Sequence, residues 1–426
     1  MPRWQWILAQ FTRRLWVRAT LIGMLGVAAA LLAALVERFI PWLPASQIGA
    51  DAVYDILTII ASSMLAVTTF SLSVMTSAYG SAASNVTPRA TRLLMEDSLT
   101  QNVLSTFIGS FLFSMVGIVV LKTGAYGDRG RFVLFLVTVA VIVLIVVSLL
   151  RWIDHLTRLG QVGETTRRVE QATREAIARR RDAPCLGGLP LLRDALPADA
   201  LPADALAVRA STIGYVQFID MEALSLCAER HQGFVQVVAI PGTFVHDGSP
   251  LAWFSATPGN ADLETVTDAV RSAFSIGDER SYDQDPRFGL MVMSEIACRA
   301  LSPAVNDHGT AIDVIGRLAR LLSLLAAAPE ADAEPIAFPK VQVAALAIDD
   351  LFEDAFMLIA RDGAGQVEIQ LRLQKCLQAL ALQGDAAFRS AALQQAALAL
   401  ERANGALPLE AEKQRLRRAI DMAANP

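Results

Sequence analysis

The stretch from Phe132 to Leu150 reads FVLFLVTVAVIVLIVVSLL, and only Thr138 and Ser148 interrupt its apolar side chains. About 20 apolar residues in a helix cross the ~30 Å hydrocarbon core of a bilayer. Only helices and closed barrels satisfy every backbone polar group in that environment. Three further long apolar runs precede this one, at residues 19–36, 53–79 and 103–121. We therefore expect four transmembrane helices, which form a membrane domain of residues 1–150.

The arginines indicate how these helices are oriented. Lys and Arg concentrate on the cytoplasmic side of membrane proteins. Arginines precede the first run, separate the second from the third, and follow the fourth in a long basic segment that starts at Arg151. The short segment after the third run argues the other way, because it carries Lys122, Arg129 and Arg131. On balance we expect a multi-pass protein of the bacterial inner membrane with both termini in the cytoplasm.

Beyond the fourth run, the chain contains three segments with different sequence patterns. Residues 151–207 contain a basic helical segment and then a Pro/Ala-rich linker. The basic helix either lies on the lipid surface or connects domains through solvent. Residues 208–258 alternate β-branched and aromatic residues with Gly turns, which predicts a small cytoplasmic β-rich subdomain. Residues 259–426 repeat apolar residues every three or four positions, which predicts a cytoplasmic helical subdomain. The expected fold class is a membrane α-helical domain joined to a cytoplasmic α+β domain with a small β-sandwich and a helical bundle.

Composition excludes several function classes. The net charge of −5 argues against a nucleic-acid partner. Four separate cysteines without CxxC spacing, at positions 185, 227, 298 and 376, read as buried free thiols. The sequence contains no HExxH cluster, phosphate loop or nucleophile elbow. We therefore expect no metal site, no cofactor, no catalytic residue and no enzymatic activity.

Small and hydroxylated residues recur every three or four positions in the second apolar run, which places them on one helix face. Two interpretations remain open. Such a stripe lets helices approach closely, or it lines a wetted pore on the axis of a symmetric oligomer. The residues are Thr58, Ser62, Thr69, Ser73, Thr76 and Gly80.

Two polar segments of the helical subdomain are candidates for a cytoplasmic polar pocket. Acids and amides placed before helices usually cap free N–H groups, which is the simpler interpretation. Alternatively, the two segments converge on a small ligand or cation, which carboxylate and amide oxygens suit. The residues are Asp283, Gln284, Asp285 and Arg287 in the first segment, and Asn306, Asp307 and His308 in the second.

The sequence resembles known proteins in two respects. The segment PGTFVHDGSPLAWF (residues 241–254) resembles the β-sandwich of biotinyl and lipoyl carrier domains. The modified lysine is missing, since no lysine lies between Lys122 and Lys340, so the resemblance implies a structural or docking module. The chain as a whole resembles the bacterial inner-membrane proteins of domain-of-unknown-function family 2254. The resemblance rests on SAASNVTPRATRLL (81–94), GYVQFID (214–220), PGTFVHDGSPL (241–251), QDPRFGL (284–290) and ALSPAVNDHGTA (300–311), although His308 stands where the family usually has proline.

These observations lead to two functional expectations. The first is a homo-oligomeric channel or channel-like assembly in the lipid bilayer, with the second helix nearest the axis and the cytoplasmic domain as vestibule or gate. The alternative is a membrane-anchored sensor or scaffold whose cytoplasmic domain binds a small ligand, ion or partner.

Overall fold

The computed structural model describes residues 2–12, 15–36, 50–124, 128–191, 205–256, 263–326 and 336–424. The chain forms two compact units. We call Ile7–Ser84 together with Pro88–Thr165 the membrane unit, and Met1–Trp6, Asn85–Thr87 and Thr166–Pro426 the α/β unit. Helix α1 (Arg3–Thr12) contributes residues to both units.

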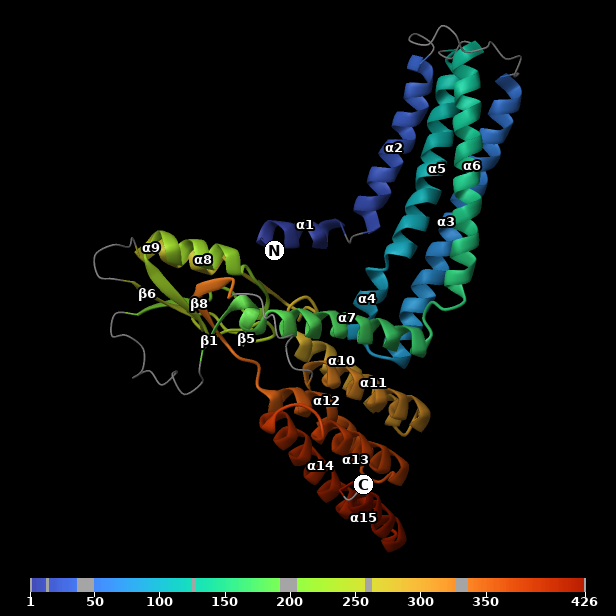
Figure 1. Cartoon of the computed structure of the whole chain (residues 1–426). Coiled ribbons are helices and arrows are strands. Elements are labelled where there is room, and N and C mark those ends of the chain that lie inside the picture. Colours follow the sequence, from blue (N-terminus) through green and yellow to red (C-terminus); the bar gives the residue numbers. More distant parts are fainter. Residues whose placement is uncertain are drawn as a thin grey trace. The chain divides into compact units, whose positions relative to one another are not determined.

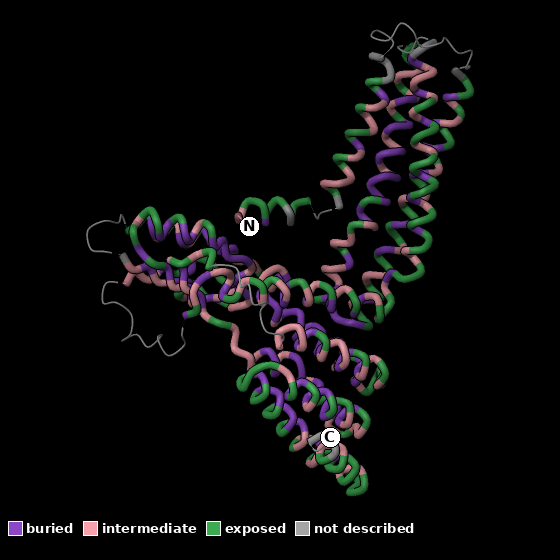
Figure 2. Tube along the Cα trace, in the orientation of Figure 1, coloured by how far each residue is buried: buried purple, intermediate pink, exposed green. Residues whose placement is uncertain are grey.

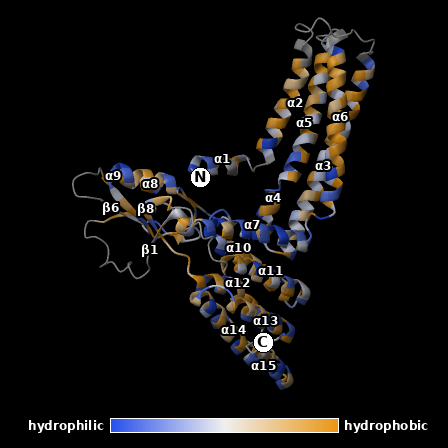
Figure 3. Cartoon of the chain, in the orientation of Figure 1, coloured by the Kyte–Doolittle hydropathy of each residue, from blue (hydrophilic) through white to orange (hydrophobic). Residues whose placement is uncertain are grey.

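The membrane unit is built of helices. These are α2 (Leu15–Val36), α3 (Ala50–Asn85), α4 (Pro88–Met95), α5 (Ser98–Lys122) and α6 (Asp128–Leu156). Figure 3 shows apolar residues along α2, α3, α5 and α6. Among the helices that the structure describes, three are long and apolar enough to cross a membrane, over Asp51–Asn85, Ser98–Lys122 and Gly130–Leu156. The predicted fourth span, residues 19–36, falls in α2. The apolar part of α2 that the structure describes, Trp16–Leu32, is shorter than these three, so this span stays a prediction.

Glycines bring α2 and α5 close together. A Cβ at Gly26 would lie 2.7 Å from the carbonyl oxygen of Gly109, and a Cβ at Gly109 would lie 2.8 Å from Ile22. Small residues permit this close packing in membrane helices. Elsewhere in the unit, buried Trp152 of α6 donates from Nε1 to Ser71 Oγ of α3 at 2.9 Å. The membrane unit therefore has a packed interior of its own.

The α/β unit contains two sheets (Figure 1). The five-stranded sheet has the order β1-β8-β4-β6-β2, and the three-stranded sheet has the order β5-β3-β7. Strand β8 pairs parallel with both β1 and β4, and the remaining pairs are antiparallel. The strands are β1 (Gly188–Leu191), β2 (Leu206–Arg209), β3 (Gly214–Ile219), β4 (Gly233–Val237), β5 (Phe244–Val245), β6 (Pro250–Ala256), β7 (Phe274–Gly277) and β8 (Phe338–Ala344).

Helices make up the rest of the α/β unit. Helices α8 and α9 pack with the strands around one apolar core, and α10 to α15 form a helical bundle. Besides the short 3-10 helix η1 (Pro184–Gly187), the helices are α7 (Val162–Asp182), α8 (Met221–Arg230), α9 (Leu263–Ser272), α10 (Pro286–Leu301), α11 (His308–Ala326), α12 (Ile348–Asp362), α13 (Val367–Ala381), α14 (Ala386–Ala406) and α15 (Glu410–Ala424).

The small β-sandwich expected within residues 208–258 is not confirmed. Strand β2 ends at Arg209 and β3 begins at Gly214, and the two strands join different sheets. Strands from outside the region complete both sheets: β1 and β8 in one, and β7 in the other. The observed architecture is thus a small mixed sheet beside a second, antiparallel sheet.

Helix α7 also differs from the expectation. Within the α/β unit it buries one face, which includes Val169, Thr173 and Ile177. A Cβ at Gly289 of α10 would lie 2.0 Å from Thr173 Oγ1, so the two helices are in direct contact. Glu170 is 7% exposed and pairs with Arg317 and Arg320 of α11. From Thr166 onward, one face of α7 therefore packs inside this unit, while Arg167, Gln171 and Glu175 on the other face stay exposed.

Candidate functional site

The predicted stripe of small and hydroxylated residues lies on the outer face of α3. Every one of its six residues is exposed within the chain, and a Cβ at Gly80 would meet nothing within 4 Å. Figure 2 shows α3 alternating between buried and exposed positions along its length. The stripe is therefore on the exposed side of α3 within the chain.

The opposite face of α3 carries the large side chains that pack inside the unit. Val53, Leu57, Ile60, Met64 and Met75 are all buried. At 100° per residue these positions lie about half a turn from the stripe. Exposed large apolar residues border the stripe on both sides: Ile59 and Phe70 on one, Leu65 and Leu72 on the other. The outer face of α3 thus presents a band of small residues between two apolar ridges.

Four of the five stripe hydroxyls donate hydrogen bonds within their own helix. Thr58 Oγ1 donates to the carbonyl oxygen of Tyr54 at 2.8 Å, and Thr76 Oγ1 donates to that of Leu72 at 2.9 Å. Ser62 and Thr69 bond in the same way to carbonyls one turn earlier. Each of these protons is satisfied, while the hydroxyl oxygens can still accept a hydrogen bond. Such a face tolerates a neighbouring helix and also water.

The first polar segment, residues 283–287, ties several elements of the α/β unit together. The Gln284 side chain accepts from the Ile219 N–H at 2.9 Å and donates to the Ile219 carbonyl at 3.2 Å, so it pairs with the end of β3. Arg287 forms ion pairs of 2.6 Å with Asp350 and Asp354 of α12. Side chains from three parts of the chain therefore meet at the start of α10.

Asp285 is the most buried member of this segment, at 2% exposed. It caps α10 by accepting from the Phe288 N–H, and it accepts from Arg280 Nε at 2.8 Å and Nη2 at 3.1 Å. Gly242 has φ +92 and sits against this pair, because a Cβ there would lie 2.4 Å from Asp285 Oδ2. Burial raises the pKa of Asp285, although the Arg280 guanidinium opposes that change. The PGTF turn and the QDPRFG segment thus meet at one buried ion pair.

The second polar segment, residues 306–308, begins α11. Asp307 caps this helix by accepting from the Thr310 N–H at 3.0 Å and from Thr310 Oγ1 at 2.6 Å. These two hydrogen bonds lower the pKa of Asp307. His308 Nδ1 lies 2.8 Å from Glu368 Oε1, and its Nε2 lies 3.0 Å from Asn306 Oδ1. Asn306 adopts a positive φ of 51 in the turn that precedes the helix.

The two polar segments do not form one pocket. They lie at opposite ends of α10, whose 16 residues span about 24 Å. The Asp307 N–H is bonded to the Ala300 carbonyl near the far end of that helix, at 2.8 Å. Compact clefts hold small ligands, so a shared ligand site is not supported by this geometry. Among the residues that the structure describes, no three His, Cys, Asp or Glu side chains are grouped to hold a metal ion.

Sequence reasoning missed the docking of the N-terminal segment onto the α/β unit. Trp6 is 6% exposed and stacks on Phe218 of β3, with ring centroids 5.0 Å apart. Its Nε1 donates to Asp283 Oδ2 at 2.8 Å. The Arg3 N–H donates to Asp220, and its guanidinium donates to the Ser272 carbonyl. The recurrence of Trp4, Ile7, Leu8 and Phe11 at helical spacing indicated a helix ahead of the first apolar run, but no local pattern indicated its docking through Trp6.

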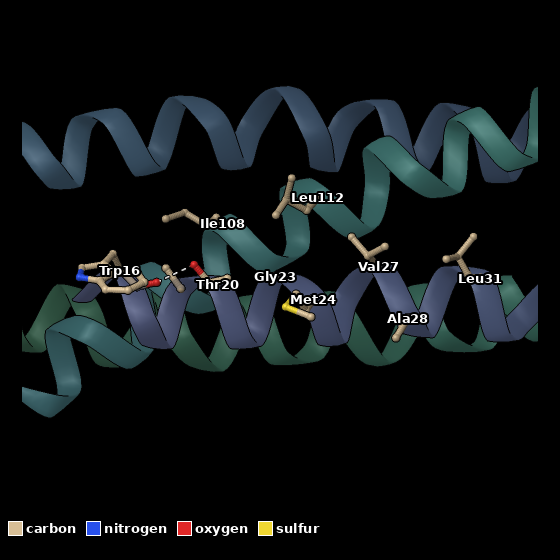
Figure 4. A pocket seen from close by; sticks show the side chains of 10 residues that line it. Trp16, Thr20, Gly23, Met24, Val27, Ala28, Leu31, Ile108 and Leu112 are labelled. Carbon is tan, nitrogen blue, oxygen red and sulfur yellow. Dashed lines mark hydrogen bonds between the residues drawn. The ribbon is translucent and has the colours of Figure 1, made fainter. Parts of the chain in front are cut away.

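An apolar groove of about 640 Å³ lies between α2 and α5 in the membrane unit (Figure 4). Trp16 and Thr20 stand at one end and Leu31 at the other, with Ile108 and Leu112 contributed by α5. Its lining contains no ionisable side chain. The groove therefore offers van der Waals contact and no chemistry of its own.

The long apolar helices define a membrane protein. Its second unit, the α/β unit, contains both helices and strands. The chain belongs to the DUF2254 family of predicted membrane proteins, whose family model matches residues 12–379. Uncharacterized proteins of Mycobacterium bovis and Mycobacterium tuberculosis are 29% identical to it over 259 residues, which is 58% of this chain and 47% of each relative. The chain thus spans about half the length of the curated relatives it matches. No solved structure matches the chain.

Proposed function

We propose that the protein is a homo-oligomeric, channel-like assembly of the bacterial inner membrane. Its subunits meet along the small-residue face of α3, and the α/β unit serves as a cytoplasmic vestibule or gate. One observation supports the proposal: all six stripe residues from Thr58 to Gly80 are exposed within the chain, and a Cβ at Gly80 would meet nothing within 4 Å.

The composition of this face favours other copies of the chain over lipid. Small residues at helix surfaces let backbones approach closely, which is the usual way membrane helices associate. The ridges formed by Ile59 and Leu65 would pack on either side of a partner helix, with the stripe between them. Where several copies surround an axis, the hydroxyls of Thr69 and Ser73 can instead face water and line a path for ions. Both arrangements require an oligomer.

The proposed topology has four membrane helices, with α2 as the fourth. The 22 residues of α2 extend about 33 Å, enough for the ~30 Å hydrocarbon core. Arginines flank this helix on the N-terminal side, and a basic segment follows α6, which favours cytoplasmic termini. A cytoplasmic α/β unit is consistent with cysteines that remain thiols, since Cys185, Cys227 and Cys376 are buried and unpaired.

The test uses purified full-length protein reconstituted in liposomes. Leucine at both stripe positions, Thr69→Leu with Ser73→Leu, would narrow or dewet a pore, so ion flux should be lost while the oligomer stays intact. If the stripe is only a close helix contact, the same leucines should wedge the helices apart and reduce the oligomer to monomers.

Val139→Leu with Val143→Leu is the matched control. Both valines are exposed on α6, so this variant should keep both assembly and flux. A wild-type protein that is monomeric in liposomes would contradict the proposal. A stable oligomer that passes no ions under voltage, tension or pH change would contradict the channel. It would favour the alternative, a membrane-anchored sensor or scaffold.

A further inference from the structure

Arg180 is a buried cation whose hydrogen-bonding capacity is not used within the α/β unit. It lies three residues beyond Ile177 and continues the buried face of α7. Its exposed fraction is 7%, and its Nη1 atom has no hydrogen-bond partner. Among the residues that the structure describes, it forms no ion pair. A buried charge is costly unless it is paired and hydrogen-bonded, so this guanidinium points to an anionic partner.

The end of α7 that carries Arg180 lies beside the start of α10. Arg179 Nε donates to the Asp283 carbonyl at 3.1 Å. About two turns earlier on α7, Thr173 contacts Gly289 of α10. The two helices therefore run antiparallel, which brings the last turns of α7 to the N-terminal end of α10.

The carboxylate that acts on Arg180 already has partners of its own. Burial lowers the pKa of Arg180, and the Cys185 thiol and the Asp285 carboxyl act against that change. Asp285 Oδ2 accepts from Arg280 Nε at 2.8 Å. Its Oδ1 accepts from Arg280 Nη2 at 3.1 Å and from the Phe288 N–H at 3.2 Å. Two guanidinium groups thus share one carboxylate whose oxygens are both engaged, and the cluster keeps an excess positive charge.

The chain around this cluster is basic and closely packed. Arg179 and Arg181 flank Arg180 in the sequence, and they are exposed and partly exposed. Gly242 has φ +92 and leaves no room for a Cβ beside Asp285, so the backbone of the PGTF turn lies directly against the carboxylate. Clustered positive charge around a confined site attracts small anions.

We propose that Arg180 and Arg280 form a binding site for a small oxyanion of the phosphate class at the start of α10. A guanidinium presents its N–H groups in a planar fork that matches phosphate oxygens. Because Arg180 is almost entirely buried, free inorganic phosphate suits the site better than a bulky headgroup or a polypeptide. The inference concerns the α/β unit alone and does not depend on the oligomer or on ion flux.

Equilibrium dialysis of purified full-length protein in detergent against radiolabelled inorganic phosphate tests this site. Wild-type protein should bind one phosphate per chain. Arg180→Gln should weaken binding by about 10–100-fold, because it removes charge-assisted hydrogen bonds. Arg180→Lys keeps the charge without the planar fork, so it should weaken binding less. Should the glutamine variant not fold, the lysine variant carries the test.

Arg181→Gln is the matched control. Arg181 is the next residue in the chain and pairs with Asp182 at 2.9 Å, so this variant should bind phosphate as wild type does. Thermal unfolding gives a second readout, at ionic strength matched with sodium chloride. Phosphate should raise the unfolding midpoint of wild type, because it binds the folded chain, and should leave that of Arg180→Gln unchanged.

Wild-type protein that binds no phosphate at millimolar concentration would overturn the proposal. So would equal binding by wild type and Arg180→Gln. Equal losses in Arg180→Gln and Arg181→Gln would also overturn it, because they would show a diffuse basic surface and not a site. Displacement of the labelled phosphate by soluble short-chain phosphatidylglycerol would assign the site to a lipid headgroup and contradict a free anion.

Discussion

The indole of Trp6 stacks on the ring of Phe218 at 5.0 Å, although 212 residues separate them in the chain, from 6 to 218. The same indole donates to Asp283, which lies beside the QDPRFG segment. The start of the chain is thereby bound to the GYVQFID strand and to the residues that precede α10. Removal of this one side chain should release the N-terminal segment.

We expect Trp6→Ala to weaken the docking of α1 by about 3–5 kcal/mol, the usual cost of deleting a buried Trp side chain. Amide exchange in residues 2–12 and 214–220 of the purified protein should become faster. Trp4→Ala is the matched control, because Trp4 is 62% exposed and makes no such contact with the α/β unit among the described residues. Equal exchange in the two variants would show that Trp6 does not anchor the segment.

Gly289→Ala should destabilise the α/β unit, because the added Cβ would lie 2.0 Å from Thr173 Oγ1 in the contact between α10 and α7. Overpacking of this kind typically costs about 1–3 kcal/mol. Gly405→Ala in α14 is the control, since a Cβ there meets nothing within 4 Å and Ala is the better helix former. Thermal unfolding in detergent should show a lower midpoint for the first variant and an equal or higher one for the second.

Asp285→Ala should cost about 3–5 kcal/mol, because it removes the buried partner of Arg280, whose side chain is only 15% exposed, and removes the cap of α10. Asp268→Ala also removes an Arg partner, that of Arg271, but Asp268 is 69% exposed. Exposed pairs are worth about 0–1 kcal/mol, so the control should unfold close to wild type. Comparable losses of thermal stability in both variants would contradict the buried role of Asp285.

Asp307 should stabilise α11 in a pH-dependent way. Hydrogen bonds from Thr310 lower the pKa of this carboxyl in the folded chain. The contribution of Asp307 to the free energy of unfolding is therefore fully present above the pKa of this carboxyl in the unfolded chain, about 3.9. It is lost as the pH falls through the lower pKa of the folded chain. At pH 7, Asp307→Ala should lower the unfolding midpoint by an amount equivalent to about 0.5–2 kcal/mol. The difference in unfolding midpoint between wild type and variant should shrink below about pH 4. A difference that grew instead would contradict a lowered pKa of Asp307 in the folded chain.

Local patterns predicted three of the long apolar helices and the helix caps, because those features depend on neighbours in sequence. The apolar run of residues 132–150 lies within α6, and Asp385 caps α14 as its position before an Ala-rich helix indicates. Asp285 and Asp307 are caps for the same reason. The three-and-four spacing of the α3 stripe also placed its residues on one face.

Features that depend on distant pairing were not predictable from one sequence. Strand β1 contains Pro190 and pairs parallel with β8, about 150 residues later, so neither strand carries a local signal of its partner. The partners of Arg287 are 63 and 67 residues away on α12. The spacing of residues in the sequence likewise did not predict the distance between the two polar segments. Helix α10 lies between them and shows that they do not meet.

Copies of the chain should meet along the outer face of α3, and cysteine crosslinking in native membranes detects that contact. Thr69→Cys and, separately, Val143→Cys are placed in a Cys298→Ser background and oxidised. Both positions are exposed within the chain, but only Thr69 lies on the stripe. An interface along the α3 stripe should give covalent dimers through Thr69→Cys and none above background through Val143→Cys. Equal or absent crosslinking at the two positions would contradict it.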